Sequence, residues 1–252
     1  IGARRTAAAL EAWLGHVYAV LDAHPVNEAR RARGEEPANF LLVKWSARHR
    51  EFRPFERVNG MIGASVSSGV TYKGIAKALG MRWYGVDYLP DWTEDLRMRI
   101  REAKRAVDEG AGFVHVHTKA TDVAGHTKDP ERKRDVIEAL DAALPALWDE
   151  GLVSPDNLVV VTGDHGTPSG TELVHSGDAV PIVMVGPATF SDDVTAFDER
   201  SCAVGSLGHL DGSDLMPEVL NRIGRIKYMS AKLTPEGGIF WPDTTEALRI
   251  ED

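Results

Sequence analysis

The chain has 252 residues, of which 43% are hydrophobic, and its formal net charge at pH 7 is −9. This length and composition are sufficient for a full hydrophobic core, in one large domain or in one domain with a small appendage. The acidic balance argues against a nucleic acid or an anionic membrane as the main partner, because both are bound through clustered Lys and Arg side chains.

The cysteine content and the absence of long apolar runs indicate the compartment. Cys202 is the only cysteine, so an internal disulfide and a cysteine-based metal cage are both excluded. No apolar run reaches the ~18 residues of a spanning helix, and no signal-peptide pattern is present. We therefore expect a cytoplasmic protein with no membrane partner. The chain starts at Ile1, without Met and within a helical pattern, which predicts that it is the remainder of a longer protein.

The first part of the chain predicts a helix, a strand, a loop and a second helix. Apolar residues at i, i+3, i+4 and i+7 spacing predict an amphipathic helix over 3–23, which the sequence His24-Pro25 ends. A short apolar run over 39–43 predicts a buried strand. Residues 60–69 are rich in Gly and Ser and predict a loop, before a helix over 72–79 that ends at Gly80.

The remainder alternates between strands and helices. A charged helix is predicted over 94–109, and a β-branched strand over 113–117 follows it. Asp129-Pro130 begins another helix, since a cap residue precedes a proline at the first helical position. Continuous apolar runs over 158–162 and 182–185 are typical of strands covered on both faces. This alternation predicts an α/β domain with a largely parallel sheet.

Carboxylates and imidazoles gather next to these predicted strands. Asp122 and His126 follow strand 113–117 at i, i+4 spacing and would face the same way on a helical turn. Asp164 and His165 end strand 158–162 and point to different sides of their loop, and His175 precedes strand 182–185. Because open parallel α/β sheets bind ligands beyond the carboxyl ends of their strands, these side chains are candidates for a shared site.

Their chemistry suits a hard-to-borderline dication. Carboxylate oxygen with imidazole nitrogen fits manganese or zinc better than calcium, and no thiolate biases the choice towards zinc. Two such ions would clamp the attacking and leaving oxygens of a phosphoryl transfer. Taken singly, Asp122 is a helix-start cap, His165 a turn residue and His175 a loop residue. It is their combination that predicts a metal centre.

Several longer motifs resemble those of one enzyme family, the cofactor-independent phosphoglycerate mutases of the archaeal type, in the alkaline phosphatase superfamily. The order and spacing match from about His24 to Ile223, so the resemblance covers the C-terminal part of these enzymes. The matching segments are residues 24–30, 73–81, 117–126, 137–141, 162–168, 175–181 and 197–216.

The resemblance implies an alkaline-phosphatase-like α/β fold, with a mostly parallel sheet flanked by helices and the end of an inserted cap domain at the N-terminus. Residues 1–24 would be the last helix of that cap domain. Residues 25–226 would be the C-terminal part of the metal-binding phosphotransferase domain, and residues 227–252 an irregular tail.

The resemblance also implies a metal-dependent, glycolytic isomerase. It would interconvert 2- and 3-phosphoglycerate through a phosphoserine, or act on a related phosphorylated or phosphonate carboxylate. Two divalent ions are implied, with Mn²⁺ as the first choice and Zn²⁺ or Mg²⁺ as alternatives. Asp122, His126 and His175 would hold one ion, and Asp164 and His165 would contribute to the other.

Substrate-binding residues are also implied. Lys73 falls where the family places a lysine that neutralises the substrate phosphate, although its spacing alone is that of a solvated helix lysine. Lys44, a second catalytic candidate, Asn27 and Arg30 complete the candidates for binding a small phosphorylated carboxylate.

The resemblance breaks at two places. The family completes its second metal with an aspartate and the phosphorylated serine, both upstream of Ile1, so we expect them on a missing segment or a second chain. Ser65, Ser67 and Ser68 occupy a Gly-rich stretch that does not resemble the nucleophile's motif. At Lys44-Trp45, where the archaeal type has Arg-Gly, a point charge replaces a bidentate fork and Trp fills space.

Two interpretations of Lys44-Trp45 stay open: a different substrate, or a surface lysine beside a Trp that packs on the cap. Two functions stay open beside the mutase. Loss of the phosphate to water would make the enzyme a metal-dependent phosphatase or phosphodiesterase. Absence of the nucleophile would make the chain a non-catalytic subunit.

Overall fold

The computed structural model describes residues 2–44, 47–48, 50–170 and 172–225. Its contacts divide the chain into two compact units, Ile1–Arg50 and Glu51–Asp252. Within the described residues, no helix is both long and apolar enough to cross a membrane. The predicted tail over 227–252 and the predicted packing of Trp45 lie outside the described residues.

The first unit contains two helices, α1 (Gly2–Asp22) and α2 (Pro25–Ala32). The first confirms the helix predicted over 3–23. His24 caps the second, since its Nδ1 accepts a hydrogen bond from the Val26 N–H. The unit extends to Arg50. The predicted domain division near residue 24 and the assignment of residues 1–24 to a cap domain stay predictions.

The strand predicted over 39–43 is not formed. These residues run as an irregular segment, and Phe40 and Leu42 are 62% and 71% exposed. The described part of the first unit offers two helices and no strand, so the backbone of this segment has nothing to pair with as a sheet. An apolar run of strand length is therefore not sufficient to specify a strand.

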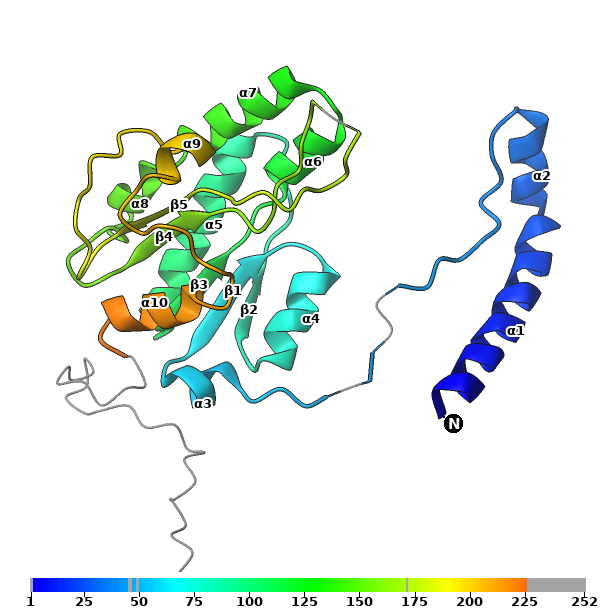
Figure 1. Ribbon diagram of the computed structural model, residues 1–252, viewed down its shortest axis with the longest axis horizontal. Helices are drawn as coiled ribbons and strands as arrows, with labels where there is room; N and C mark the ends of the chain where they lie inside the picture. Colours follow the sequence, from blue (N-terminus) through cyan, green and yellow to red (C-terminus); the bar gives the residue numbers. More distant parts are fainter. Residues whose placement is uncertain (1, 45–46, 49, 171, 226–252) are drawn as a thin grey trace, which may run out of the picture. The chain divides into compact units, whose positions relative to one another are not determined.

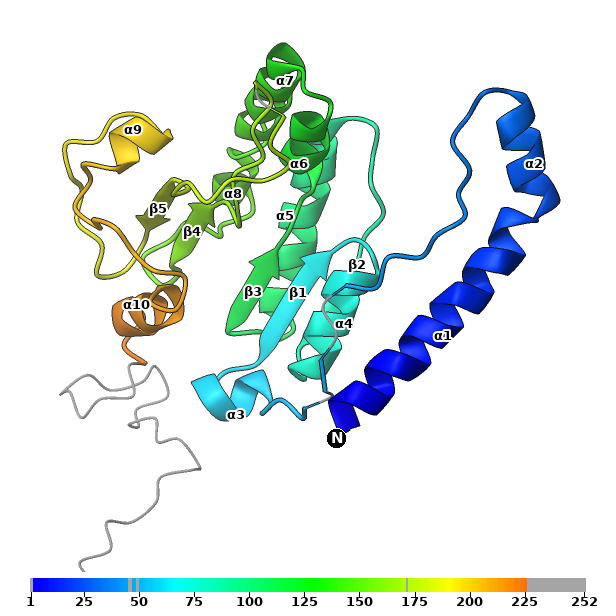
Figure 2. The ribbon, with the colours of Figure 1, turned by 45° about the vertical axis from the view of Figure 1, so that its right-hand side comes forward.

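The second unit alternates strands and helices (Figures 1 and 2). Its elements in chain order are α3 (Phe55–Asn59), β1 (Gly63–Ser67), α4 (Val70–Ala78), β2 (Arg82–Gly85), α5 (Trp92–Asp108), β3 (Phe113–Val116), α6 (Ala120–His126), α7 (Pro130–Asp141), α8 (Ala146–Asp149), β4 (Val159–Thr162), β5 (Ile182–Val185), α9 (Glu199–Cys202) and α10 (Leu215–Arg222).

The main sheet has the order β2-β1-β3, with both pairs parallel. This confirms the α/β class and a parallel sheet flanked by helices. The central strand β1 occupies the Gly/Ser-rich stretch predicted to be a loop, and that prediction is wrong. Small residues suit this strand because the space is tight: a Cβ on Gly63 would lie 2.7 Å from Phe55.

The two faces of β1 have different neighbours. Ala64 and Val66 are fully buried and form the core with residues of α5, including Ile100. Because side chains alternate along a strand, Ser65 and Ser67 face the other side. There Ser67 accepts a hydrogen bond from the Trp83 indole N–H at 3.2 Å. The serine hydroxyls are thus part of the packed sheet.

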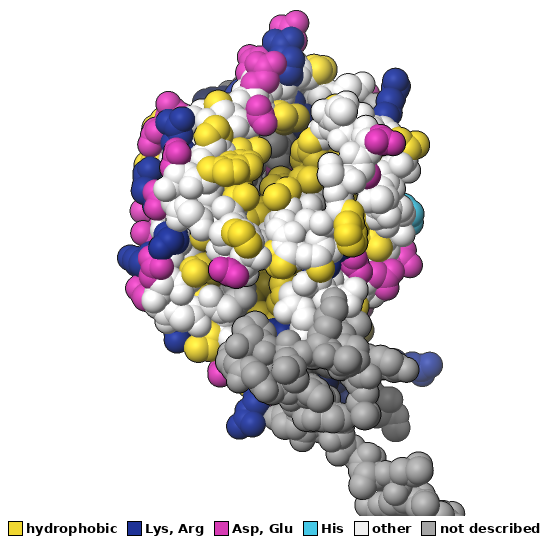
Figure 3. All heavy atoms as spheres, turned by 90° about the vertical axis from the view of Figure 1, so that its left-hand side faces the viewer, with side chains coloured by type: hydrophobic (Ala, Val, Ile, Leu, Met, Phe, Trp, Pro, Cys, Tyr) yellow, Lys and Arg dark blue, Asp and Glu magenta, His cyan; other side chains and the backbone are white. Residues whose placement is uncertain are grey.

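A second, smaller sheet pairs β4 with β5 in antiparallel fashion. The predicted covering of these strands on both faces is wrong, since Val183 and Val185 are 37% and 41% exposed. A continuous apolar run indicates contact with other apolar groups but carries no information on strand direction. On the side of the second unit that carries β4 and β5, apolar side chains gather between charged ones (Figure 3).

Helix α5 carries a buried ion pair. Arg99 and Asp95 have fully buried side chains, and Arg99 Nε donates to Asp95 Oδ2 at 2.6 Å. Arg99 also donates to the Ser68 hydroxyl beyond β1 and to the His117 carbonyl beyond β3. Asp95 accepts from the Leu89 N–H. The pair therefore ties the carboxyl ends of two neighbouring strands to one helix.

Breaking this pair should destabilise the second unit strongly. Asp95→Asn would leave the Arg99 charge buried without its counter-ion, at a cost of about 3–5 kcal/mol, measurable as the free energy of unfolding in urea. The control is Asp108→Asn on the same helix, where Lys104 pairs with Asp108 at the surface and the cost should stay below about 1 kcal/mol. Equal, small losses in both variants would contradict the role assigned to Asp95.

Candidate metal centre

The first ligands stand on α6, directly beyond β3. Asp122 and His126 lie one turn apart, and His126 Nε2 is 3.3 Å from Asp122 Oδ1. The predicted i, i+4 pairing on one helical face is confirmed. The Asp122 side chain is 16% exposed whereas that of His126 is 41% exposed, so the carboxylate forms the inner part of the site.

The loop after β4 contacts α6 at Asp122. The buried Thr167 donates from Oγ1 to Asp122 Oδ1 at 2.9 Å. Gly125 makes this approach feasible, because a Cβ there would lie 2.6 Å from the Thr167 carbonyl oxygen. The same loop carries Asp164 and His165, and it holds His165 near Asp122.

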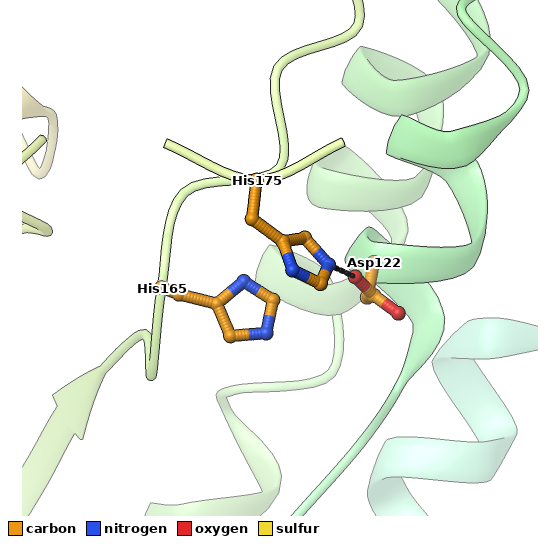
Figure 4. Close-up of side chains that lie close together, drawn as sticks. All are labelled: Asp122, His165 and His175. Carbon is orange, nitrogen blue, oxygen red and sulfur yellow. Dashed lines mark ion pairs between the residues drawn. The ribbon is translucent and has the colours of Figure 1, made fainter. Parts of the chain in front are cut away.

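His175 is brought in by a short backbone bridge between two loops. Ser176 donates from its N–H to the Gly166 carbonyl at 3.0 Å. His175 Nε2 then lies 3.5 Å from Asp122 Oδ1, and its ring centroid is 4.1 Å from that of His165. Figure 4 shows both imidazoles turned towards the Asp122 carboxylate.

These donors fit a divalent cation. Asp122, His165 and His175 each offer a ligand atom, all within 4.8 Å of one another. Burial raises the pKa of Asp122, but the Thr167 hydrogen bond, Lys119 and His126 together bring it below its usual value. A deprotonated carboxylate among imidazoles is a ligand set for manganese or zinc.

The predicted division of the ligands between two ions stays a prediction. In the structure the His165 imidazole lies with Asp122 and His175, and the backbone N–H of His165 donates to Asp164 Oδ1. The Asp164 side chain is 64% exposed, so it can face a second ion. All five predicted metal ligands therefore belong to one region at the ends of β3 and β4.

A small cavity of about 60 Å³ lies beside the cluster. Sequence reasoning identified Asp122, Asp164 and His165 in it but did not assign the other lining residues to the site. Lys119 could have been recognised from its position three residues before a predicted ligand. The further lining residues are Tyr72, His117, Thr118, Lys119, Thr121, Lys133 and Thr167.

The two histidines of β3 differ in their surroundings. His115 Nδ1 is 3.1 Å from the Ser65 hydroxyl, within hydrogen-bond distance. His117 stacks on Tyr72 with ring centroids 3.8 Å apart, and its buried Nδ1 has no partner among the described residues. Burial, reinforced by the charge of His115, lowers the pKa of His117 to about 4, so this wall of the cavity is neutral at pH 7.

Lys73, the predicted substrate residue in the second unit, is not among the residues that line that cavity. Lys73 lies on α4 with its Nζ 4.5 Å from the centre of the Trp83 ring. In the first unit, Lys44 is exposed, the Asn27 amide is bonded to the backbone of Leu21 and Ala38, and Arg30 pairs with Glu35. Substrate binding by these four residues stays a prediction.

Several known proteins are similar to this chain over most of its length. The chain is 36% identical over 230 residues to the 2,3-bisphosphoglycerate-independent phosphoglycerate mutase 2 of Methanocaldococcus jannaschii, covering 88% of this chain and 49% of that protein. Similar structures are the PH0037 protein of Pyrococcus horikoshii (TM-score 0.75, 29% identity, 90% of this chain and 59% of that one) and the cofactor-independent phosphoglycerate mutase of Thermoplasma acidophilum (TM-score 0.53, 30% identity, 86% and 52%).

These matches confirm the resemblance stated from the motifs, and the chain spans about half the length of the curated relatives it matches. The sequence model of the Metalloenzyme superfamily matches residues 19–221, which is most of the chain. On that evidence the protein belongs to the Metalloenzyme superfamily.

Proposed function

We propose that this chain carries the metal-binding part of a phosphomutase that interconverts 2- and 3-phosphoglycerate, or a closely related phosphorylated carboxylate, in the cytoplasm. The observation that carries the proposal is the convergence of the His126 and His175 imidazoles on Asp122 Oδ1, beside a cavity lined by Lys119 and Lys133. The names of the similar proteins add the reaction and the substrate class.

The residues have separate roles in this proposal. Asp122, His126 and His175 would hold one ion, and Asp164 and His165 part of a second. The bound ions would supply Lewis-acid stabilisation of phosphoryl oxygens. Lys73 and Lys44 would neutralise further charge on the substrate. The neutral His117 and Tyr72 would form the wall against which the substrate lies.

The nucleophile in this proposal is none of the serines in or next to β1. Ser65, Ser67 and Ser68 are all buried, and each is hydrogen-bonded within the sheet region. We propose that the phosphorylated serine and one further metal ligand come from another segment of the complete enzyme. Incubation of the complete enzyme with 3-phosphoglycerate tests the reaction: 2-phosphoglycerate should form, whereas release of inorganic phosphate alone would indicate a hydrolase.

Metal binding should depend on His126. Purified without chelators, the protein should contain Mn²⁺ or Zn²⁺ by elemental analysis, and His126→Ala should weaken Mn²⁺ binding about tenfold or more, since even outer-shell changes commonly cost 10–100-fold. His16→Ala on the exposed face of α1 is the control and should bind as wild type. Near-zero metal content in wild type, unchanged in His126→Ala, would contradict the assignment of His126 as a metal ligand.

The close packing at Gly125 gives a separate test of the site's construction. Gly125→Ala places a methyl group 2.6 Å from the Thr167 carbonyl, so the loop that carries His165 must move away from Asp122. We expect Mn²⁺ affinity, measured by calorimetric titration, to fall about tenfold. Gly15→Ala on α1, where a Cβ meets nothing within 4 Å, should leave the affinity unchanged. Unaltered affinity in Gly125→Ala would show that the loop contact does not form the site.

Lys73 tests the substrate side of the proposal. A flexible ammonium that stabilises the transferring group acts in the transition state, so Lys73→Ala in the complete enzyme should lower turnover by roughly 10²-fold while metal content stays unchanged. Lys77→Ala, one turn later and exposed, is the control. Near-wild-type turnover in both variants would make Lys73 a surface lysine.

A further inference from the structure

Lys119 lies next to both the candidate metal ligands and the cavity. It directly precedes α6, and its Nζ lies 3.4 Å from Asp122 Oδ2. Its side chain is 49% exposed and also lines the cavity. Lys119 therefore has access both to a predicted metal ligand and to the space where a ligand would bind.

The two oxygens of Asp122 have separate partners. Oδ1 receives the Thr167 hydroxyl and faces the Nε2 atoms of His126 and His175. Lys119 approaches Oδ2. Without a metal, the Lys119 ammonium thus balances the negative charge of the Asp122 carboxylate. Among the described residues, Asp122 is the only ion-pair partner of Lys119.

A dication on Asp122 changes this balance. Its positive charges repel an ammonium held on the same carboxylate, and they remove most of the attraction that keeps Lys119 there. The side chain is long and half exposed, so it can turn away at little cost in packing. The neighbouring space is the cavity, whose lining includes Thr118 and Thr121.

Lys133 cannot take the same role. Its Nζ donates to the Thr167 carbonyl at 2.8 Å, so it is held by the loop that forms the metal site. Lys119 is therefore the cavity lysine that metal binding sets free. The cavity volume of about 60 Å³ has room for a few waters or one small oxyanion group.

We propose that Lys119 is a metal-gated anion ligand. It neutralises Asp122 in the metal-free protein and turns into the cavity to bind an oxyanion of the phosphate class once a dication occupies Asp122. This inference rests on the metal centre proposed above, and it adds a residue that the phosphomutase resemblance does not assign.

The test is a pair of calorimetric titrations on the full chain, with wild type, Lys119→Met and Lys119→Gln. Metal-free protein is titrated with Mn²⁺, and Mn²⁺-loaded protein with inorganic phosphate. Loss of the competing ammonium should tighten Mn²⁺ binding about fivefold, the scale of a half-exposed ion pair. Loss of a charged donor should weaken phosphate binding about tenfold.

Lys104→Met on α5 is the matched control, since Lys104 also pairs with a nearby aspartate, Asp108, and it should change neither titration. Mn²⁺ binding that is unchanged or weaker in both Lys119 variants, with normal binding in wild type, would overturn this inference alone. Phosphate binding to the loaded wild type that is absent, or unaffected by the substitutions, would overturn its anion-binding half. Absence of Mn²⁺ binding in wild type would overturn it together with the metal centre.

Discussion

The Asp122 carboxylate is the point on which the other features of the site depend. The Thr167 hydroxyl and two imidazoles meet at its Oδ1, and Lys119 approaches its Oδ2. Lys119 and His126 flank Asp122 at the start and the end of α6, whereas Thr167 and His175 come from loops far along the chain, so the carboxylate is the common partner of three separate segments. A carboxylate surrounded in this way is stabilised in its charged form, which is the form that binds a metal.

The scaffold explains why these segments meet. The main sheet reverses its direction of growth at β1, since β2 is added on one side and β3 on the other, and such a switch point places a crevice beyond the carboxyl ends of the strands. The buried Asp95–Arg99 pair binds the backbone at the end of β3 and the Ser68 hydroxyl beyond β1. Rigid strand ends on one side and the Gly125–Thr167 contact on the other fix the position of α6 between them.

Much of this could be predicted from residue patterns with a local physical cause. Asp129 followed by Pro130 predicted the start of α7, and the structure shows its carboxylate accepting from two backbone N–H groups. The i, i+4 spacing of Asp122 and His126 predicted their common face, because residues four apart lie one turn apart on a helix. The ligand types of His165 and His175 predicted metal chemistry once their positions next to strands were recognised.

The predictions that failed concern contacts between distant segments. The composition of 63–67 resembles a loop, yet the strand forms there because two parallel neighbours and a tight space around Gly63 require small residues. The apolar run over 39–43 has strand composition but no strand to pair with in the described first unit. Tyr72 was missed because only the fold brings α4 to the cavity beyond β3, whereas Lys119 lies three residues before Asp122 and could have been recognised from the sequence.

The central claim is that α6 and the loops after β4 form one metal centre, and anomalous X-ray diffraction from crystals of the Mn²⁺- or Zn²⁺-loaded protein tests it most directly. The account predicts an anomalous peak within bonding distance, about 2.0–2.2 Å, of Asp122 and of at least two of the imidazoles of His126, His165 and His175. Peaks confined to other acidic side chains, with none at Asp122, would contradict it.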